Sequence, residues 1–265
     1  MPDYVSFDRA APTYEATRGF PPGVADQVAQ AAQTLVGGAG TRVLEVGIGT
    51  GRVGRPLAAH GLRVVGLDLS RAMLAQLRHL TPNGAPRPRL IQGEASRLPL
   101  ASASLDAALA VHVFHLIPDW QGTLQELRRV LRPGRPLLNG FDWRPPESPS
   151  SRLFERWRSL LRERGCDPHG PGARDFDDVK AYLLAAGATL DEVRVGAWSV
   201  TRSVAHALET IEHRTWSSTW AVPEDFFPAC LAELRAWAEA EFGGLDQTYT
   251  LQHHFVWQVY RWPDC

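Results

Sequence analysis

A glycine-rich segment, with one carboxylate before it and another after it, is the part of the sequence best suited to ligand chemistry. Gly47, Gly49 and Gly51 follow an apolar run at alternate positions, and such glycines let the backbone turn tightly and approach a ligand closely. Glu45 lies inside the apolar run, where a carboxylate suits a cationic ammonium group and would repel a pyrophosphate. Asp68 ends the next apolar run, and its two oxygens can accept hydrogen bonds from both hydroxyls of a ribose.

The same segment also fits a second pattern. Gly49, Gly51 and Gly54 formally match GxGxxG, the dinucleotide-binding fingerprint, so a nicotinamide-dependent oxidoreductase is an alternative function. Asp68 fits either interpretation. Glu45 and the alternate spacing of the glycines favour a ligand with an ammonium group, and nothing downstream supplies an identifiable site for hydride transfer.

Short β-rich runs alternate with helical stretches between Gly40 and about Phe141. The predicted strands cover residues 42–46, 63–67, 89–92, 105–111 and 136–141, with helices up to His60 and over residues 71–80 and 119–131. The first helix must begin near Gly54, because Pro56 is tolerated only in a first turn. Strands and helices that alternate in this way predict an α/β fold with right-handed crossovers and a parallel sheet.

The composition changes after the fifth predicted strand, at the Pro/Ser-rich segment 142–151. Beyond it we predict helices over residues 152–164, 177–186, 203–217 and 224–242, and strands over 193–202 and 251–262. We expect residues 1–141 to form a core with an N-terminal cap segment, and 142–265 to add the remaining strands within one structural unit. Its helical insertions, 142–174 and 202–245, should cover the carboxyl edge of the sheet.

All nine tryptophans lie at or after Trp120. Taken singly, each is suited to the core of a helical insertion, whereas together they indicate an aromatic-lined pocket for a substrate. We predict that Trp143, Trp216 and Trp220 contribute to that pocket.

Composition and charge exclude several classes of protein. The 265 residues are 44% hydrophobic and 22% charged, which is typical of a globular protein. The 28 basic and 29 acidic side chains leave a formal charge of −1, without the basic surface that nucleic acids or acidic membranes require. The longest apolar run, residues 107–117, is too short to cross a bilayer, and the acidic start lacks a secretory signal. Cys166, Cys230 and Cys265 are widely spaced, which favours reduced thiols in a cytoplasmic protein over disulfides or zinc.

Five sequence blocks together resemble the class I S-adenosylmethionine-dependent methyltransferases. The resemblance is to the small-molecule branch, methyltransferase type 11, which includes the ubiquinone/menaquinone C-methyltransferases. The blocks are YEATRGFP (14–21), VLEVGIGTGR (43–52), VVGLDLSRAML (64–74), the run from IQGEA to PDW (91–120) and ELRRVLRPGRPLL (126–138). The resemblance implies a Rossmann-like, doubly wound sheet of seven strands, mostly parallel with the last strand antiparallel. It also implies S-adenosyl-L-methionine as the cofactor.

The resemblance assigns roles to the glycine loop and its neighbours. The loop would receive the methionine part of the cofactor, with Glu45 near its amino group. Asp68 would hold the ribose, and Leu69 would lie against the adenine. Glu94 and Ala95 would meet the adenine amino group, although the family usually has aspartate in place of Glu94.

Two further segments would complete the cofactor site. Val111 and His112 would line the cofactor beneath the sulfonium, and Tyr14 and Arg18 would close over it. The predicted cofactor-binding residues are Tyr14, Arg18, Glu45, Gly47, Gly49, Thr50, Gly51, Asp68, Leu69, Met73, Glu94, Ala95, Val111 and His112.

The reaction that the resemblance implies is an in-line transfer of the sulfonium methyl group to a small-molecule acceptor, promoted mainly by positioning. No catalytic residue is identified; His112, His115 and Tyr14 are candidates, since histidine titrates near neutral pH. We predict no metal, because Asp119 is the only acid near the two histidines. The fourth strand leads into VHVF, not the [DN]PP[YF] element of amino-methylating nucleic-acid enzymes. A monomer or homodimer is expected, and a non-catalytic cofactor-binding regulator on the same fold is the main alternative.

Overall fold

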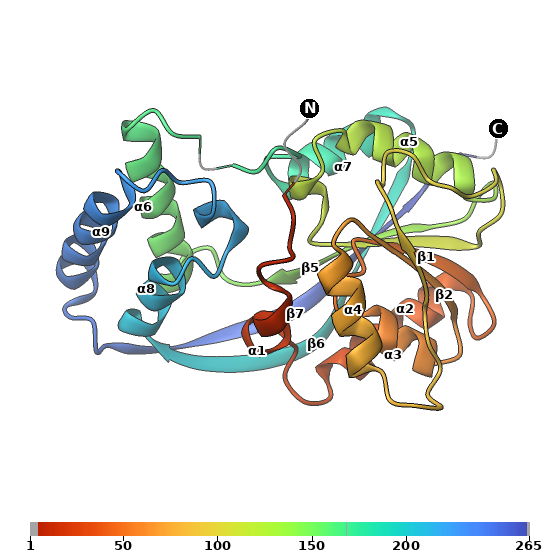
Figure 1. The fold of residues 1–265 in the computed structure, drawn as a ribbon, viewed down its shortest axis with the longest axis horizontal. Helices are drawn as coiled ribbons and strands as arrows, with labels where there is room; N and C mark the ends of the chain where they lie inside the picture. Colours follow the sequence, from red (N-terminus) through yellow and green to blue (C-terminus); the bar gives the residue numbers. More distant parts are fainter. Residues whose placement is uncertain (1–4, 168, 264–265) are drawn as a thin grey trace. The chain divides into compact units, whose positions relative to one another are not determined.

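The computed structural model describes residues 5–167 and 169–263, which build a seven-stranded sheet with helices packed against it (Figure 1). The chain divides into two units. The first contains the described residues up to Phe141, Pro171–Gly196 and the described residues from Phe255 onward. The second contains Asp142–Gly170 and Ala197–His254, so strands β5, β6 and β7 each have residues in both units.

The strand order in the sheet is β3-β2-β1-β4-β5-β7-β6. The strands are β1 (Arg42–Val46), β2 (Arg63–Asp68), β3 (Arg89–Gln92), β4 (Ala107–Val111), β5 (Leu137–Trp143), β6 (Thr189–Ser203) and β7 (Thr248–Arg261). Strands β1 to β5 pair in parallel, whereas the last strands run antiparallel. The predicted fold class is therefore confirmed, and the predicted bounds of β1 and β3 are those of the structure.

Helices connect and cover the strands. They are α1 (Tyr14–Arg18), α2 (Val24–Val36), α3 (Gly54–Ala59), α4 (Arg71–Leu80), α5 (Trp120–Val130), α6 (Pro149–Glu163), α7 (Phe176–Ala185), α8 (Val204–Glu212) and α9 (Phe227–Phe242), with short 3-10 turns η1 (Ala11–Thr13), η2 (Phe114–Leu116) and η3 (Ser217–Thr219). Helix α3 begins at Gly54, as Pro56 requires. Helices α1 and α2 were not predicted, and α8 ends earlier than the predicted helix over 203–217.

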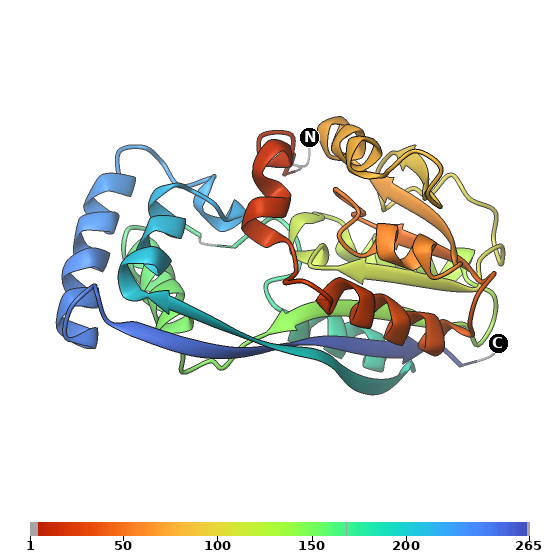
Figure 2. The ribbon, with the colours of Figure 1, turned by 90° about the horizontal axis from the view of Figure 1, so that it is seen from below.

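The core of the first unit lies on both faces of the sheet. Tyr260 of β7 shares a buried cluster with Leu127 of α5 and Leu183 of α7. Neighbouring Trp257 must point to the opposite face, because its position differs by an odd number of residues. Its indole N–H donates to the backbone carbonyl of Val28 in α2 at 3.2 Å. Helices therefore pack on both sides of the sheet (Figure 2).

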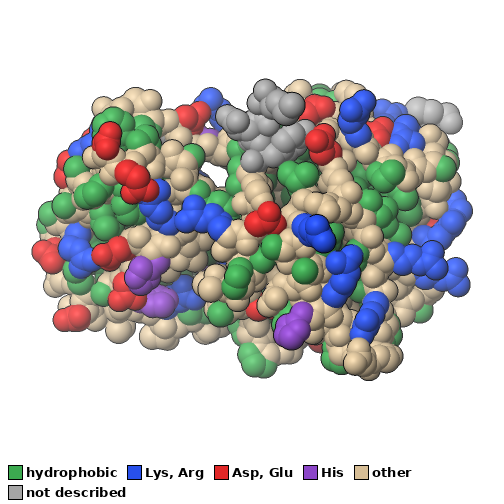
Figure 3. Space-filling view, viewed as in Figure 1, with side chains coloured by type: hydrophobic (Ala, Val, Ile, Leu, Met, Phe, Trp, Pro, Cys, Tyr) green, Lys and Arg blue, Asp and Glu red, His purple; other side chains and the backbone are tan. Residues whose placement is uncertain are grey.

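The second unit has a hydrophobic core of its own, built by α6, α8 and α9. Its largest member is Trp157, whose side chain is fully buried and meets the ring of Phe227 edge-on at 5.3 Å. Cys166 and Cys230 are free thiols, and Cys265 lies outside the described residues. None of the helices in the described part of the chain combines the length and apolar content that a membrane span requires. Acidic and basic side chains are interspersed over the face shown in Figure 3.

Candidate functional site

The loop between β1 and α3 has a backbone that only glycine adopts easily. Gly47 and Gly51 have φ angles of +67° and +78°, in the left-handed region. A Cβ atom on Gly47 would lie 2.5 Å from Cγ2 of Val113, and one on Gly51 would lie 2.7 Å from Cγ of Arg55. The loop is therefore specified both by its dihedral angles and by the side chains packed against it.

The carboxylate of Asp68 is fixed by two backbone donors at the end of β2. Oδ2 accepts a hydrogen bond from the N–H of Gly49, and Oδ1 accepts one from the N–H of Ser70, both at 2.8 Å. Burial raises the pKa of Asp68, and these two hydrogen bonds oppose that rise. The side chain is thus oriented before any ligand arrives.

A cavity opens where β1, β2 and β4 end. Ten of the predicted cofactor-binding residues line it: Tyr14, Gly47, Gly49, Asp68, Leu69, Met73, Glu94, Ala95, Val111 and His112. The lining also includes apolar residues that sequence reasoning missed, namely Val5 and Phe7 near the N-terminus and Leu116 and Ile117 around η2. The fold therefore brings five separate segments to one cavity, and the cofactor contacts of these residues stay predictions.

Glu45 lies behind the glycine loop and not in the cavity lining. Its side chain is buried, with 2% exposed, and its Oε2 atom has no hydrogen-bond partner among the described residues. Burial raises the pKa of Glu45 to about 8, although the positive charge of Arg52 acts in the opposite direction. At neutral pH this carboxyl is therefore mainly protonated, and its predicted contact with an amino group stays a prediction.

The N-terminal segment is attached to the start of α4. Oδ1 of Asp8 accepts hydrogen bonds from the hydroxyl of Ser70 at 2.5 Å and from the N–H of Ala72 at 3.1 Å. These donors lower the pKa of Asp8. Ser70 is also the N-cap of α4, since its hydroxyl accepts from the N–H of Met73. Asp8 therefore adds a second acceptor at a helix end that already favours negative charge.

Helix α1 is attached to the glycine loop itself. The carboxylate of Glu15 accepts a hydrogen bond from the hydroxyl of Thr50 and forms an ion pair with Arg55 at 3.3 Å. Arg52 donates to the backbone carbonyl of Arg18 at 2.9 Å. Among the described residues that were predicted to bind the cofactor, Arg18, Glu45, Thr50 and Gly51 do not line the cavity. The side chain of Thr50 and the backbone of Arg18 instead join α1 to the loop.

His112 carries an unusual backbone conformation at the cavity wall. Its φ angle of +49° lies in the left-handed region, which costs on the order of 1 kcal/mol for a residue with a Cβ atom. Its N–H donates to the carbonyl of Gly140 at 3.2 Å, and its ring meets Phe176 edge-on at 6.0 Å. Tyr14 also lines the cavity, whereas His115 is not part of the lining. No group of three or more potential metal ligands occurs in the described ranges 5–167 and 169–263.

The three predicted pocket tryptophans all belong to the second unit. The ring of Trp143 stacks on His254 with 4.5 Å between centroids. The indole N–H groups of Trp216 and Trp220 donate within the same unit, to the hydroxyl of Thr210 and to a backbone carbonyl. Their role in binding an acceptor stays a prediction.

Comparison with known proteins finds similarity in the part of the chain that contains the glycine loop. Residues 44–138 match the family model described as a methyltransferase domain. A ubiquinone/menaquinone biosynthesis C-methyltransferase of Syntrophotalea carbinolica is 38% identical over 138 residues, which cover 50% of this chain and 57% of that protein. The chain spans about half the length of the curated relatives it matches.

Solved structures share the fold at low sequence identity. One is the phosphoethanolamine N-methyltransferase 2 of Haemonchus contortus, solved with phosphomonomethylethanolamine and S-adenosylhomocysteine. It is 18% identical with a TM-score of 0.56, over 97% of this chain and 58% of that chain. Another is the [4+2]-cyclase SpnF, 18% identical with a TM-score of 0.58, over 98% and 94% of the two chains. Both likenesses concern the fold alone.

Proposed function

Because residues 44–138 match the family model of a methyltransferase domain, we propose that the protein transfers the methyl group of S-adenosylmethionine to a small-molecule acceptor. The formal charge of −1 supports a small molecule over a nucleic acid as the acceptor. Under this proposal S-adenosylmethionine is the cofactor, the acceptor is a small molecule, and the methyl group is transferred by in-line displacement.

The observation that carries the proposal is the orientation of Asp68 beside the glycine loop. A carboxylate held by two backbone N–H groups keeps lone pairs for a vicinal diol, as a ribose presents. Gly47 and Gly49 line the cavity beside Asp68, so the backbone of the loop is available to a ligand there. Under the proposal, Asp68 holds the ribose, Leu69 covers the adenine, and Glu94 meets the adenine amino group.

The bound cofactor supplies an electrophilic methyl group whose sulfur loses its positive charge as the group is transferred. The residues of this chain contribute by positioning and by excluding water. Val111, Leu116 and Ile117 give the cavity an apolar wall. Because an apolar environment stabilises charges poorly, it favours a step in which the positive charge on the sulfur disappears. His112 and Tyr14 lie in the same wall and are the candidates to accept a proton from the acceptor.

Calorimetry with S-adenosylhomocysteine and, separately, with NAD tests the cofactor directly. We expect saturable binding of S-adenosylhomocysteine and no comparable response to NAD. Gly47→Ala should abolish that binding, because its Cβ atom would meet Val113. Gly84→Ala, on an open surface turn with a φ of +82°, is a control for left-handed glycines. Preferential binding of NAD would favour the oxidoreductase alternative.

A second candidate function is a protein that binds the cofactor without methyl transfer. The cyclase that shares this fold favours keeping this candidate, because one architecture supports different chemistries. Production of S-adenosylhomocysteine from S-adenosylmethionine, measured across a panel of small acceptors, separates the two. Tight binding with no turnover for any acceptor would support the non-catalytic candidate.

A further inference from the structure

Side-chain pairs across the end of the β6–β7 ribbon indicate its register. The hydroxyl groups of Thr201 and Thr250 are 2.8 Å apart, and the hydroxyl of Ser199 donates to the side-chain carbonyl of Gln252 at 3.0 Å. The two strands are neighbours in the sheet and antiparallel. One step along each strand therefore moves from one opposed pair to the next.

The same register places an arginine opposite a tyrosine on the other face of this ribbon. Residue 202 opposes residue 249, so Arg202 and Tyr249 are cross-strand neighbours. Residue 198 opposes residue 253, and the rings of Trp198 and His253 indeed stack at 5.4 Å. Tyr249 packs against the hydrophobic core of the second unit, so this face is the one that the helices cover.

A second arginine reaches the same neighbourhood from the end of β5. The guanidinium of Arg144 lies 5.6 Å from the ring centroid of Phe154. Burial lowers the pKa of Arg144, as do the charges of Arg158 and Arg202, whereas Tyr249 and the carboxylate of Asp142 raise it. The carboxylate of Asp142 is the acidic group whose charge acts on Arg144, so in the described part of this neighbourhood one carboxylate faces the guanidinium groups of Arg144, Arg158 and Arg202.

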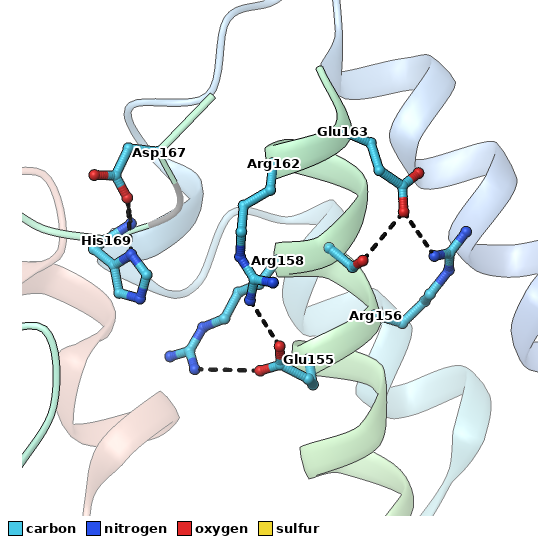
Figure 4. Close-up of polar contacts among 8 residues, drawn as sticks. Glu155, Arg156, Arg158, Arg162, Glu163, Asp167 and His169 are labelled. Atoms are coloured by element: carbon cyan, nitrogen blue, oxygen red, sulfur yellow. Dashed lines mark hydrogen bonds and ion pairs between the residues drawn. The ribbon is translucent and has the colours of Figure 1, made fainter. Parts of the chain in front are cut away.

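Helix α6 adds positive charge to this neighbourhood. Figure 4 shows Arg158 and Arg162 extending toward the same carboxylate, that of Glu155, at 3.8 Å and 2.7 Å. Arg156 and Glu163 pair with each other at 3.1 Å. One carboxylate thus serves two guanidinium groups, and the Nε of Arg158 is buried without a hydrogen-bond partner among the described residues.

The hydroxyl of Tyr249 is a further hydrogen-bond donor. Burial raises its pKa, although the nearby Ser150, Arg202 and Arg144 act in the opposite direction, so the phenol stays protonated at neutral pH. The hydroxyl is buried and has no partner in hydrogen-bond geometry within the described ranges. Arginine offers only donors, and the phenol can donate as well as accept, so the cluster is complementary to a negatively charged acceptor.

We propose that the second unit binds a small molecule through its acidic group, held by Arg144 and Arg202 with the hydroxyl of Tyr249. Burial of the Arg144 guanidinium is unfavourable beside two further positive charges, and a bound carboxylate or phosphate offsets that cost with charge-assisted hydrogen bonds.

Binding can be tested without the cofactor, on protein labelled with 15N at the arginine Nε. Inorganic phosphate and benzoate are titrated separately, with ionic strength held constant by chloride. We expect saturable shifts of the Arg144 and Arg202 Nε–H signals, assigned from their lysine variants. Saturation by phosphate alone identifies a phosphate ester as the ligand class, and saturation by benzoate alone identifies a carboxylic acid.

Two variants and one control locate the site. Arg144→Gln and Arg202→Gln should each weaken binding at least about tenfold, as expected for the loss of a charge-assisted pair. Arg235→Gln, on α9, removes the same charge from an ion pair with Glu212 of α8 and should leave binding within about twofold. Arg202 is exposed, so its variant should fold even if the Arg144 variant does not. Absence of saturation for both probes, or equal binding by the folded Arg202→Gln protein, would overturn the site.

Calorimetry with S-adenosylhomocysteine on the same samples keeps the two proposals separate. Intact binding of S-adenosylhomocysteine without saturable anion binding contradicts the acid site alone, and the reverse result contradicts the proposed function alone.

Discussion

The carboxylate of Asp68 accepts a hydrogen bond from the backbone N–H of Gly49 at 2.8 Å, which fastens the end of β2 to the loop after β1. One side chain thus has two tasks, because it orders the loop and also faces the cavity. Substitutions at this position must therefore be interpreted with both tasks in mind.

Asp68→Ala should lower the affinity for S-adenosylhomocysteine at least about tenfold, because charge-assisted hydrogen bonds contribute roughly 1.5–3 kcal/mol. Asp68→Asn keeps one acceptor oxygen and should lose less. Calorimetry measures both, and Asp191→Ala, at an exposed residue of β6, is the control. Unchanged affinity in a folded Asp68→Ala protein would show that the ribose lies elsewhere.

Glu45 should make stability depend on pH. Its pKa is raised from 4.5 to about 8 in the folded protein, so the folded state binds more protons than the unfolded chain between these values. The free energy of unfolding should therefore fall as the pH rises through this window, by at most about 1.4 kcal/mol per pH unit.

Glu45→Gln should remove this pH dependence of the free energy of unfolding. The stability of the variant relative to the wild type should therefore increase as the pH rises to about 8. Urea unfolding at several pH values measures the effect. Glu147→Gln, at an exposed position, should leave the pH dependence unchanged. Parallel curves for wild type and Glu45→Gln would show that the carboxyl is not buried as described.

Glu15 should control the opening of the N-terminal segment. Glu15→Ala removes the contacts with Thr50 and Arg55, so amide hydrogen exchange in Tyr14–Arg18 should accelerate, roughly tenfold for a loss of about 1.4 kcal/mol. Asp26→Ala is a matched control, since it removes an ion pair with His60. Equal acceleration in both variants would indicate general destabilisation.

Replacement by glycine and by alanine should rank in opposite order of stability at His112 and at His115, its neighbour in η2. Because the φ angle of His112 is +49°, His112→Gly should be more stable than His112→Ala by about 1 kcal/mol. His115 lies in a 3-10 turn, so there the glycine variant should be the less stable one. Thermal unfolding of the four variants measures this, and the same order at both positions would contradict the left-handed backbone of His112.

Local patterns predicted the central strands well. Strands such as β1 and β4 are covered on both faces, so they appear in the sequence as continuous apolar runs. Helix α2 was missed, although Val24, Val28 and Ala32 recur at intervals of four and are buried. Its alanine and glutamine content makes that apolar face weak as a sequence signal.

The sequence predicted those parts of the candidate site that are formed by residues close together in the chain. The glycine loop depends on neighbouring residues, whereas Asp8 and Ala72 are 64 positions apart and no periodic pattern connects them. Glu45 was expected near a ligand, but whether a strand residue faces a cavity or the core depends on what packs behind it. The arginines of the second unit were not singled out, since they come from separate segments that meet only in the folded chain.

The division of β5, β6 and β7 between the two units has a consequence for engineering. A chain truncated after Phe141 would lack Trp257 and Tyr260, which are fully buried in the first unit. Neither unit can therefore be excised as one continuous gene fragment. To graft a relative's second unit onto this sheet, both intervals, Asp142–Gly170 and Ala197–His254, would have to be exchanged at once, with junctions inside three strands.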